Sequence, residues 1–291
     1  MINKIQIGFI VRKEASEVEL STLCSLPGVS GDEYEVHQYL SREYQQLNLD
    51  LKRDKLGSIF GERLVENSPF KVMISSNIDE CGGMIDDIHE SGLLSFVTIG
   101  DVLPKDFLHQ RVCLLTRHHQ RVYGYILQKQ EKFWIHIGAK SQQEVEEFGI
   151  QVGDTFVLEI PVIETEQMIL SKNISNRAGV YAAYQLMETM PSLPYTLSIG
   201  GIAQSIVGYR GAITATNTIM PDVSIVLDVA PVRDYAEKTV YIRYFDKTLL
   251  PNVSLVKEIK TVAQSLGYEV KANVQEKGTD GSFIHKSLVG T

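Results

Sequence analysis

The stretch Val72-Met73-Ile74-Ser75-Ser76-Asn77-Ile78-Asp79-Glu80 decides the fold, because a short apolar run ends there in a turn with two acids. The run from Phe70 to Ser75 shows little alternation, which is typical of a strand buried on both faces. In α/β proteins the ends of such strands are where ligands bind. We therefore expect a buried strand that leads directly into a functional loop at Asp79 and Glu80.

Strands and helices alternate before and after this stretch. Ser30 and Glu33 have the Ser-x-x-Glu form of a capping box, so we expect a helix over residues 32–47. Beyond Met168 the pattern predicts helices at 176–190 and 252–266, and strands at 196–203, 223–228, 239–245 and 268–274. This alternation predicts an α/β sheet with helices on its faces.

The middle of the chain has a different composition, with short strand-like segments separated by glycines and acidic turns. We expect strands at 93–99, 111–115, 122–127, 133–137 and 155–160, and one helix at 141–148 that begins with another Ser-x-x-Glu. The sequence therefore predicts a discontinuous α/β domain of residues 1–83 and 167–291. A β-rich insertion of residues 84–166 interrupts it.

Composition excludes several classes of function. The chain has 291 residues, 44% of them hydrophobic, which suffices for a real core. Its formal net charge of -8, without a run of Lys or Arg, argues against nucleic acid or an anionic membrane as the main partner. Small molecules, peptides or other protein subunits are the partners that this composition favours.

Cysteine usage and the apolar segments favour a cytoplasmic setting. Cys24, Cys81 and Cys113 are odd in number and widely spaced, which favours neither a disulfide framework nor a thiolate zinc site. The apolar patch from Ile5 to Val11 is too short for a signal peptide core. No segment approaches the ~20 apolar residues that span a bilayer.

Several segments together resemble the glutamyl and deblocking aminopeptidase family, the co-catalytic metallopeptidases that assemble into tetrahedral particles. The resemblance covers nearly the whole chain and rests on short landmarks in the family's order. These are Leu26-Pro27-Gly28-Val29-Ser30-Gly31, Asp54-Lys55-Leu56-Gly57, residues 135–141, Gly149-Ile150 with Gly153-Asp154, and Ile242-Arg243-Tyr244-Phe245-Asp246. It implies a mixed-sheet, zinc-peptidase-like α/β/α domain with a barrel-like insertion that serves as a dimerisation or lid domain.

The resemblance also implies a site with two divalent ions, zinc or cobalt, and a glutamate as general base. Two ions polarise the scissile carbonyl and lower the pKa of a bridging water, and they require carboxylate and imidazole ligands. The family's His-x-Asp-Glu motif falls on Asn77-Ile78-Asp79-Glu80, so the ligand histidine is replaced by Asn77 while the orienting acid survives as Asp79.

Three further positions change in the same direction. The bridging aspartate falls on Ser175, followed by Asn176 and Arg177, and a neutral hydroxyl is a poor substitute for a bridging carboxylate. The Glu-Glu pair that holds the general base and a metal ligand falls on Ser205 and Ile206. The general base and this metal ligand are then both absent.

Two ligand positions keep suitable side chains, Asp228 at a strand end and His285 in the stretch 278–285. Each also has a purely structural interpretation, as a turn acceptor or a hydrogen-bonded histidine. Zinc normally takes three protein ligands even in an open catalytic site. We therefore expect no bound cofactor, although one ion held by Asp228, His285 and either Asp79 or Glu80 remains an alternative.

Other residues near these positions could line a ligand pocket or suggest other chemistry. Glu80, Asn176, Arg177 and Arg210 are the pocket candidates that the family motifs place beside the site. Ser205 lacks the Gly-x-Ser-x-Gly elbow of a serine hydrolase, so a nucleophile is not expected there.

Three hypotheses follow. The first is a homologue of metal-dependent aminopeptidases that has lost its metals and base and acts as a peptide-binding, structural or regulatory subunit. The second is an active metalloaminopeptidase or related hydrolase with a reorganised one-metal site. The third is a regulatory partner that assembles with an active paralogue. The resemblance implies self-association through dimers, up to a dodecamer.

Overall fold

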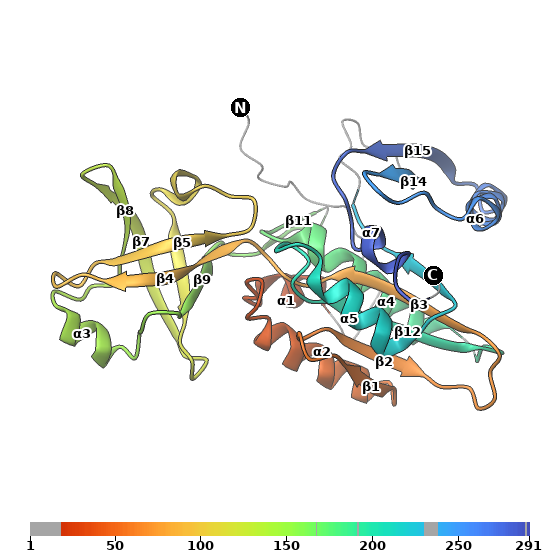
Figure 1. Ribbon diagram of the computed structural model, residues 1–291, viewed down its shortest axis with the longest axis horizontal. Coiled ribbons are helices and arrows are strands. Elements are labelled where there is room, and N and C mark those ends of the chain that lie inside the picture. Colours follow the sequence, from red (N-terminus) through yellow and green to blue (C-terminus); the bar gives the residue numbers. More distant parts are fainter. Residues whose placement is uncertain (1–18, 167, 191, 230–237, 289) are drawn as a thin grey trace.

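The computed structural model describes residues 19–166, 168–190, 192–229, 238–288 and 290–291 (Figure 1). The apolar patch from Ile5 to Val11 lies outside these residues. None of the helices in the described part of the chain combines the length and the apolar character that crossing a membrane requires.

A five-stranded mixed sheet forms the centre of the larger part of the molecule. Its strands in spatial order are β1 (Asp50–Arg53), β2 (Ile59–Arg63), β12 (Thr196–Ile202), β3 (Lys71–Asn77) and β13 (Val223–Val226). β12 runs antiparallel to β2 and parallel to β3, and β13 is also parallel to β3. The carboxyl ends of β12, β3 and β13 therefore lie at the same edge of the sheet.

Helices cover both faces of this sheet. Helices α1 (Leu20–Ser25), α2 (Tyr34–Gln46) and α4 (Ile174–Thr189) share one apolar cluster with Ile59 and Ile74. On the opposite face, α5 (Arg210–Ile219) and the short α7 (Gly281–Ile284) pack against Phe60 and Met73. Neighbouring residues of a strand thus point to opposite faces. The expected three-layer α/β/α arrangement is confirmed.

The insertion is a closed β-barrel that projects from one side of the α/β layers (Figure 1). Its strands in spatial order are β4 (Gly82–Ile88), β5 (Leu94–Ile99), β8 (Lys132–His136), β7 (Arg121–Lys129), β6 (Arg111–Leu115) and β9 (Thr155–Leu158). Phe96, Phe107 and Phe156 meet edge to face in its core. The barrel-like insertion is confirmed, whereas the domain boundaries given above stay a prediction.

Two small helices belong to the insertion, η1 (Pro104–Phe107) and α3 (Gln142–Glu147). The hydroxyl of Ser141 accepts a hydrogen bond from the backbone N–H of Glu144 at 3.2 Å, so the cap expected for α3 forms. The short strands β10 (Ile163–Glu164) and β11 (Ile169–Leu170) follow the barrel.

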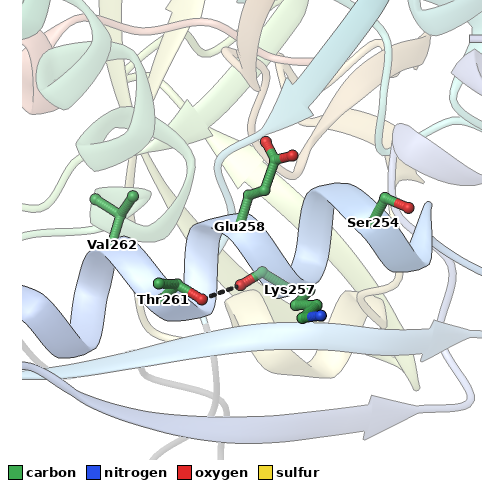
Figure 2. A pocket seen from close by; sticks show the side chains of 5 residues that line it. All are labelled: Ser254, Lys257, Glu258, Thr261 and Val262. Atoms are coloured by element: carbon green, nitrogen blue, oxygen red, sulfur yellow. Dashed lines mark hydrogen bonds between the residues drawn. The ribbon is translucent and has the colours of Figure 1, made fainter.

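The last part of the chain is a parallel pair of strands, β14 (Thr239–Asp246) and β15 (Glu269–Gln275), with helix α6 (Val253–Ser265) beside it. This helix buries only Val256 and Ala263. A groove of about 510 Å³ lies along α6. Figure 2 shows the side chains that line it, among which Thr261 donates a hydrogen bond to the carbonyl of Lys257. Ser254, Lys257, Glu258, Thr261 and Val262 line the groove, and none of them was a candidate site residue.

One expected local feature is wrong. Helix α2 begins at Tyr34, and Glu33 at its N-cap makes no side-chain capping bond. The Glu33 carboxylate instead accepts hydrogen bonds from the backbone N–H groups of Gly31 at 3.0 Å and Gln204 at 2.9 Å. Burial raises the pKa of Glu33 to about 7. This side chain therefore connects the start of α2 to the loop after β12, a long-range contact that a local motif does not reveal.

Candidate functional site

The loop after β3 lies at the edge where the parallel strands end. Asn77 is paired with Ile202 of β12, and the backbone N–H of Leu227 bonds the carbonyl of Ser75 at 2.7 Å. Three segments far apart in sequence, the ends of β3, β12 and β13, thus meet at this edge. This is the place in an open α/β sheet where ligands bind.

Asp79 is completely buried in this loop. One of its carboxylate oxygens accepts a hydrogen bond from the backbone N–H of Ile206 at 2.8 Å, and the other contacts the Asn77 amide nitrogen at 3.4 Å. The amide of Asn176 donates to the backbone carbonyl of Asp79, and Ser175 donates to the Asn176 side-chain oxygen at 2.9 Å. Burial raises the pKa of Asp79. The structure therefore brings Asn77, Asp79, Ser175, Asn176 and Ile206 together.

Glu80 is held by cations of the chain itself. The ammonium of Lys172 lies 2.9 Å from one Glu80 carboxylate oxygen and 3.1 Å from the other. The guanidinium of Arg177 approaches to 3.9 Å, and the backbone N–H of Gly28 donates to Glu80 at 3.0 Å. Lys172 and Glu80 expose only 10% and 5% of their side chains, so this is a shielded ion pair.

Arg177 anchors this network from the protein interior. Its side chain is fully buried in α4, and burial lowers its pKa. A Cβ atom on Gly28 would lie 2.7 Å from Arg177 Nη2, so only glycine leaves room for the guanidinium there. Gly28 is thereby required for packing at the site.

Ser205 is paired with an acid that the sequence analysis left without a role. Its hydroxyl donates to the Asp280 carboxylate at 2.7 Å, and both residues are buried. Burial, together with the negative charges of Asp79 and Asp228, raises the pKa of Asp280 to about 8, although the Ser205 hydrogen bond opposes the shift. Near neutral pH this side chain is therefore largely a neutral acid.

Two further contacts join the loop after β12, which carries Ser205, to the segment that carries Asp280. The hydroxyl of Tyr209 donates to the carbonyl of Gly278, and its ring stacks on Phe283 with the centroids 5.3 Å apart. The loop after β12 and the loop before α7 therefore form one unit at the site.

The remaining candidates do not contact Asp79 or Glu80 in the contacts described above. Asp228 forms an ion pair with Arg243 of β14 at 3.1 Å. The Nδ1 atom of His285 lies 2.8 Å from the carbonyl of Gly281, one turn earlier in the chain. Arg210 begins helix α5, and it is exposed.

A metal centre needs several carboxylate, imidazole or thiolate donors that converge on one point. Within the described ranges, no three His, Cys, Asp or Glu side chains form a group able to hold an ion. The trio of Asp228, His285 and Asp79 or Glu80 is therefore not assembled. Lys172 and Arg177 neutralise the charge of Glu80, and Arg243 neutralises that of Asp228. The residues present do not fit a two-ion centre.

Sequence reasoning missed Lys172, Asp280 and Glu33 as members of this site. Asp280 lies in the stretch 278–285 named above, and Lys172 lies three residues before Ser175; their charge among small polar residues was the available signal. Nothing in the sequence indicated their partners, because Lys172 is 92 residues from Glu80 and Asp280 is 75 residues from Ser205.

The family model of the M42 glutamyl aminopeptidases matches residues 57–291. The chain belongs to the M42 family. The putative aminopeptidase FrvX of Escherichia coli is 31% identical over 90% of this chain and 81% of its own length. The M42 family peptidases are metal-dependent.

Solved structures agree with this assignment. The TET aminopeptidase of a marine-sediment archaeon of the Thaumarchaeota has a TM-score of 0.84 and 27% identity, over 93% of this chain and 85% of that one. The TET1 peptidase of Pyrococcus horikoshii, described as assembling into a tetrahedron or a large octahedral shell, has a TM-score of 0.80 and covers 91% and 86% of the two chains. Its identity is 22%, so that likeness concerns the fold.

Proposed function

We propose that this M42 chain has lost the two-metal centre and the general base, and acts as a peptide-binding, structural or regulatory subunit. The observation that carries the proposal is that Asp228, a retained ligand position, is paired with Arg243 at 3.1 Å, and that Glu80 beside it in the one-ion alternative is paired with Lys172 at 2.9 Å and Arg177 at 3.9 Å. An acidic side chain neutralised by buried cations of its own chain has little remaining attraction for a divalent ion.

The replaced positions support the same proposal. Asn77, Ser175, Ser205 and Ile206 stand where the family pattern places ligands and the base, and all four are neutral. The Ser205 hydroxyl donates a hydrogen bond to Asp280, which is itself largely protonated near neutral pH, so this pair is a poor base for activating water.

The test is to purify the full chain with excess zinc or cobalt, remove free metal, and measure bound metal and the hydrolysis of aminoacyl-nitroanilides. An active M42 glutamyl aminopeptidase treated in parallel is the positive control. We expect less than one tightly bound ion per chain and no turnover above the buffer rate. Two tightly bound ions with turnover would contradict the proposal.

A single bound ion would support the alternative of an active enzyme with a reorganised site. In that case the variant His285→Ala should lose both the ion and the activity. Retention of both in this variant would locate the ion elsewhere in the chain.

Self-association in the cytoplasm is part of the proposal. The TET1 peptidase of Pyrococcus horikoshii is described as assembling into a tetrahedron or a large octahedral shell, which supports self-association. Light scattering of the purified chain gives its particle mass, and mixing with an active paralogue shows whether the two co-assemble. A monomer under both conditions would contradict a subunit role.

A further inference from the structure

Three consecutive residues after β12, residues 204–206, are each bonded to a different buried acid. The three pairs are the backbone N–H of Gln204 donating to Glu33 at 2.9 Å, the Ser205 hydroxyl donating to Asp280 at 2.7 Å, and the backbone N–H of Ile206 donating to Asp79 at 2.8 Å. The acids come from the start of α2, the loop after β3 and the segment before α7, and none exposes more than 6% of its surface. We call Glu33, Asp79 and Asp280 the acid clamp.

The clamped residues lie in a loop whose backbone has an unfavourable conformation. Gln204 has φ of +54°, in the left-handed region that residues with a Cβ atom rarely adopt. Val207 and Gly208, which follow the clamped residues, are exposed to solvent. A loop of this kind depends on the contacts that hold it, and the acid clamp supplies one at each of three residues.

Protonation keeps like charges out of the clamp. Burial raises the pKa of Glu33 to about 7 and that of Asp280 to about 8, and the charge of Asp79 adds to both shifts. The hydrogen bonds that the two acids accept from Gln204 and Ser205 oppose these shifts without cancelling them. When Glu33 and Asp280 lose their protons, negative charges face one another at a place that water does not screen.

The groups around the clamp leave this repulsion in place. The titratable or charged groups that face it are Arg177 from α4, Cys81 beside Asp79, Asp228 after β13 and Tyr209 before α5. Arg177 is the cation among them, and it is shared with Glu80 at 3.9 Å. Asp228 adds to the negative potential at Asp280.

We propose that residues 204–206 are a pH-dependent segment, docked while Glu33 and Asp280 hold protons and released as they lose them. Release takes the Ile206 N–H away from Asp79 and opens the carboxyl edge of β3 and β12 to a ligand. The inference rests on the proposed function only in taking this edge as the ligand site, and it needs neither metal nor peptidase activity.

The sign of the pH dependence follows from where the protons are bound. In the released form the two acids reach water, and their pKa values return toward the ordinary 4.5 for Glu33 and 3.8 for Asp280. The docked form then binds more protons between these values and about 7 and 8, so docking weakens as pH rises. Each acid contributes up to about ten-fold per pH unit within its window.

Hydrogen exchange of the Gln204 and Ile206 amides, resolved by fragmentation mass spectrometry, measures the release. Dividing each rate by the intrinsic rate at that pH gives the protection factor. Between about pH 5.5 and 8 we expect protection of both amides to stay below that of β12, and to fall by up to about ten-fold per pH unit for each titrating acid. Glu33→Gln should reduce the slope below pH 7, and Asp280→Asn should remove the slope between pH 7 and 8.

The matched control is Asp87→Asn, which removes an acid from an exposed position of β4 and should keep the wild-type profile. If Asp280→Asn does not fold, the wild-type profile and Glu33→Gln decide the matter. A flat profile at both amides in the wild type would overturn the proposal. Protection equal to that of β12 at every pH would also overturn it, because the segment then opens only when the whole protein unfolds. Metal content and hydrolysis do not enter these measurements, so a failed clamp and a failed proposed function are distinguishable.

Discussion

At the scale of single residues, the site is a set of acids whose charges are neutralised within the chain. Lys172 and Arg177 do this for Glu80, and Arg243 for Asp228. Asp280 is different, because it is fully buried and its partner Ser205 is neutral. Its carboxyl group therefore retains a proton, as its pKa of about 8 indicates.

This property predicts how stability depends on pH. Between pH 3.8, the ordinary pKa of an aspartate, and its folded-state pKa of about 8, folded Asp280 binds a proton that the unfolded chain has released. The folded state binds more protons, so the free energy of unfolding falls as pH rises across this window, by at most ~1.4 kcal/mol per pH unit. Asp280→Asn removes the titrating group and should flatten the pH dependence.

Urea unfolding at several pH values between 5 and 8 measures this slope. Asp87→Asn, at an exposed position of β4, is the control and should keep the wild-type slope. Parallel curves for wild type and Asp280→Asn would refute the assignment of the proton to Asp280.

At the scale of elements, α4 approaches β3 closely because Gly179 has no side chain. A Cβ atom on Gly179 would lie 2.4 Å from Ser76 Oγ and 2.7 Å from Ser76 Cβ. This contact places the start of α4, with Ser175, Asn176 and Arg177, at the end of β3. The position of half the site thus depends on one glycine.

Gly179→Ala should therefore destabilise the protein, although alanine is the better helix former by ~1 kcal/mol. Overpacking of this kind costs about 1–3 kcal/mol, which outweighs the propensity. Thermal unfolding followed by circular dichroism measures the effect. Adding Ser76→Gly removes the contacting atoms and should recover part of the loss, whereas a higher melting temperature in Gly179→Ala alone would show that the contact is not tight.

At the scale of the whole molecule, the barrel and the α/β layers are coupled through a buried cluster of Val29, from the loop before α2, with the barrel residues Cys113, Leu115 and Val157. Trp134, the only tryptophan, lies in β8 of the barrel, so its fluorescence reports the barrel alone. We expect the urea transitions of Trp134 fluorescence and of far-UV circular dichroism to coincide in the wild type. Val29→Ala leaves a cavity at the junction and should separate the two transitions.

The comparison variant is Val122→Ala, which shortens a residue packed within the barrel rather than at its junction. It should destabilise the barrel without the specific loss of coupling that Val29→Ala causes. Coincident transitions in Val29→Ala would mean that the contacts of Asp32, Tyr34 and Glu35 with the barrel residues Thr155, His119 and Arg121 suffice to couple the two parts.

Much of the fold follows from local pattern. The short apolar runs that became β3, β5 and β6 are recognisable because a strand's composition and length are local properties. The hairpin of β1 and β2 was not expected, since Asp50–Arg53 is mostly charged and is stabilised by its neighbours. Helix α5 was also missed, because it begins in a glycine-rich turn and depends on Ala212 and Ala215 packing near Phe60.

The sequence by itself determined the order of strands and helices, the family, and the absence of acidic side chains at Asn77, Ser175, Ser205 and Ile206. Only the tertiary structure decided which charges meet: Lys172 with Glu80, Ser205 with Asp280, and Arg121 with Glu35 across 86 residues. The physical reason is the separation in sequence over which each kind of interaction acts. Strand and helix patterns repeat over a few residues, whereas a charge pair depends on positions that the folding of the whole chain brings together.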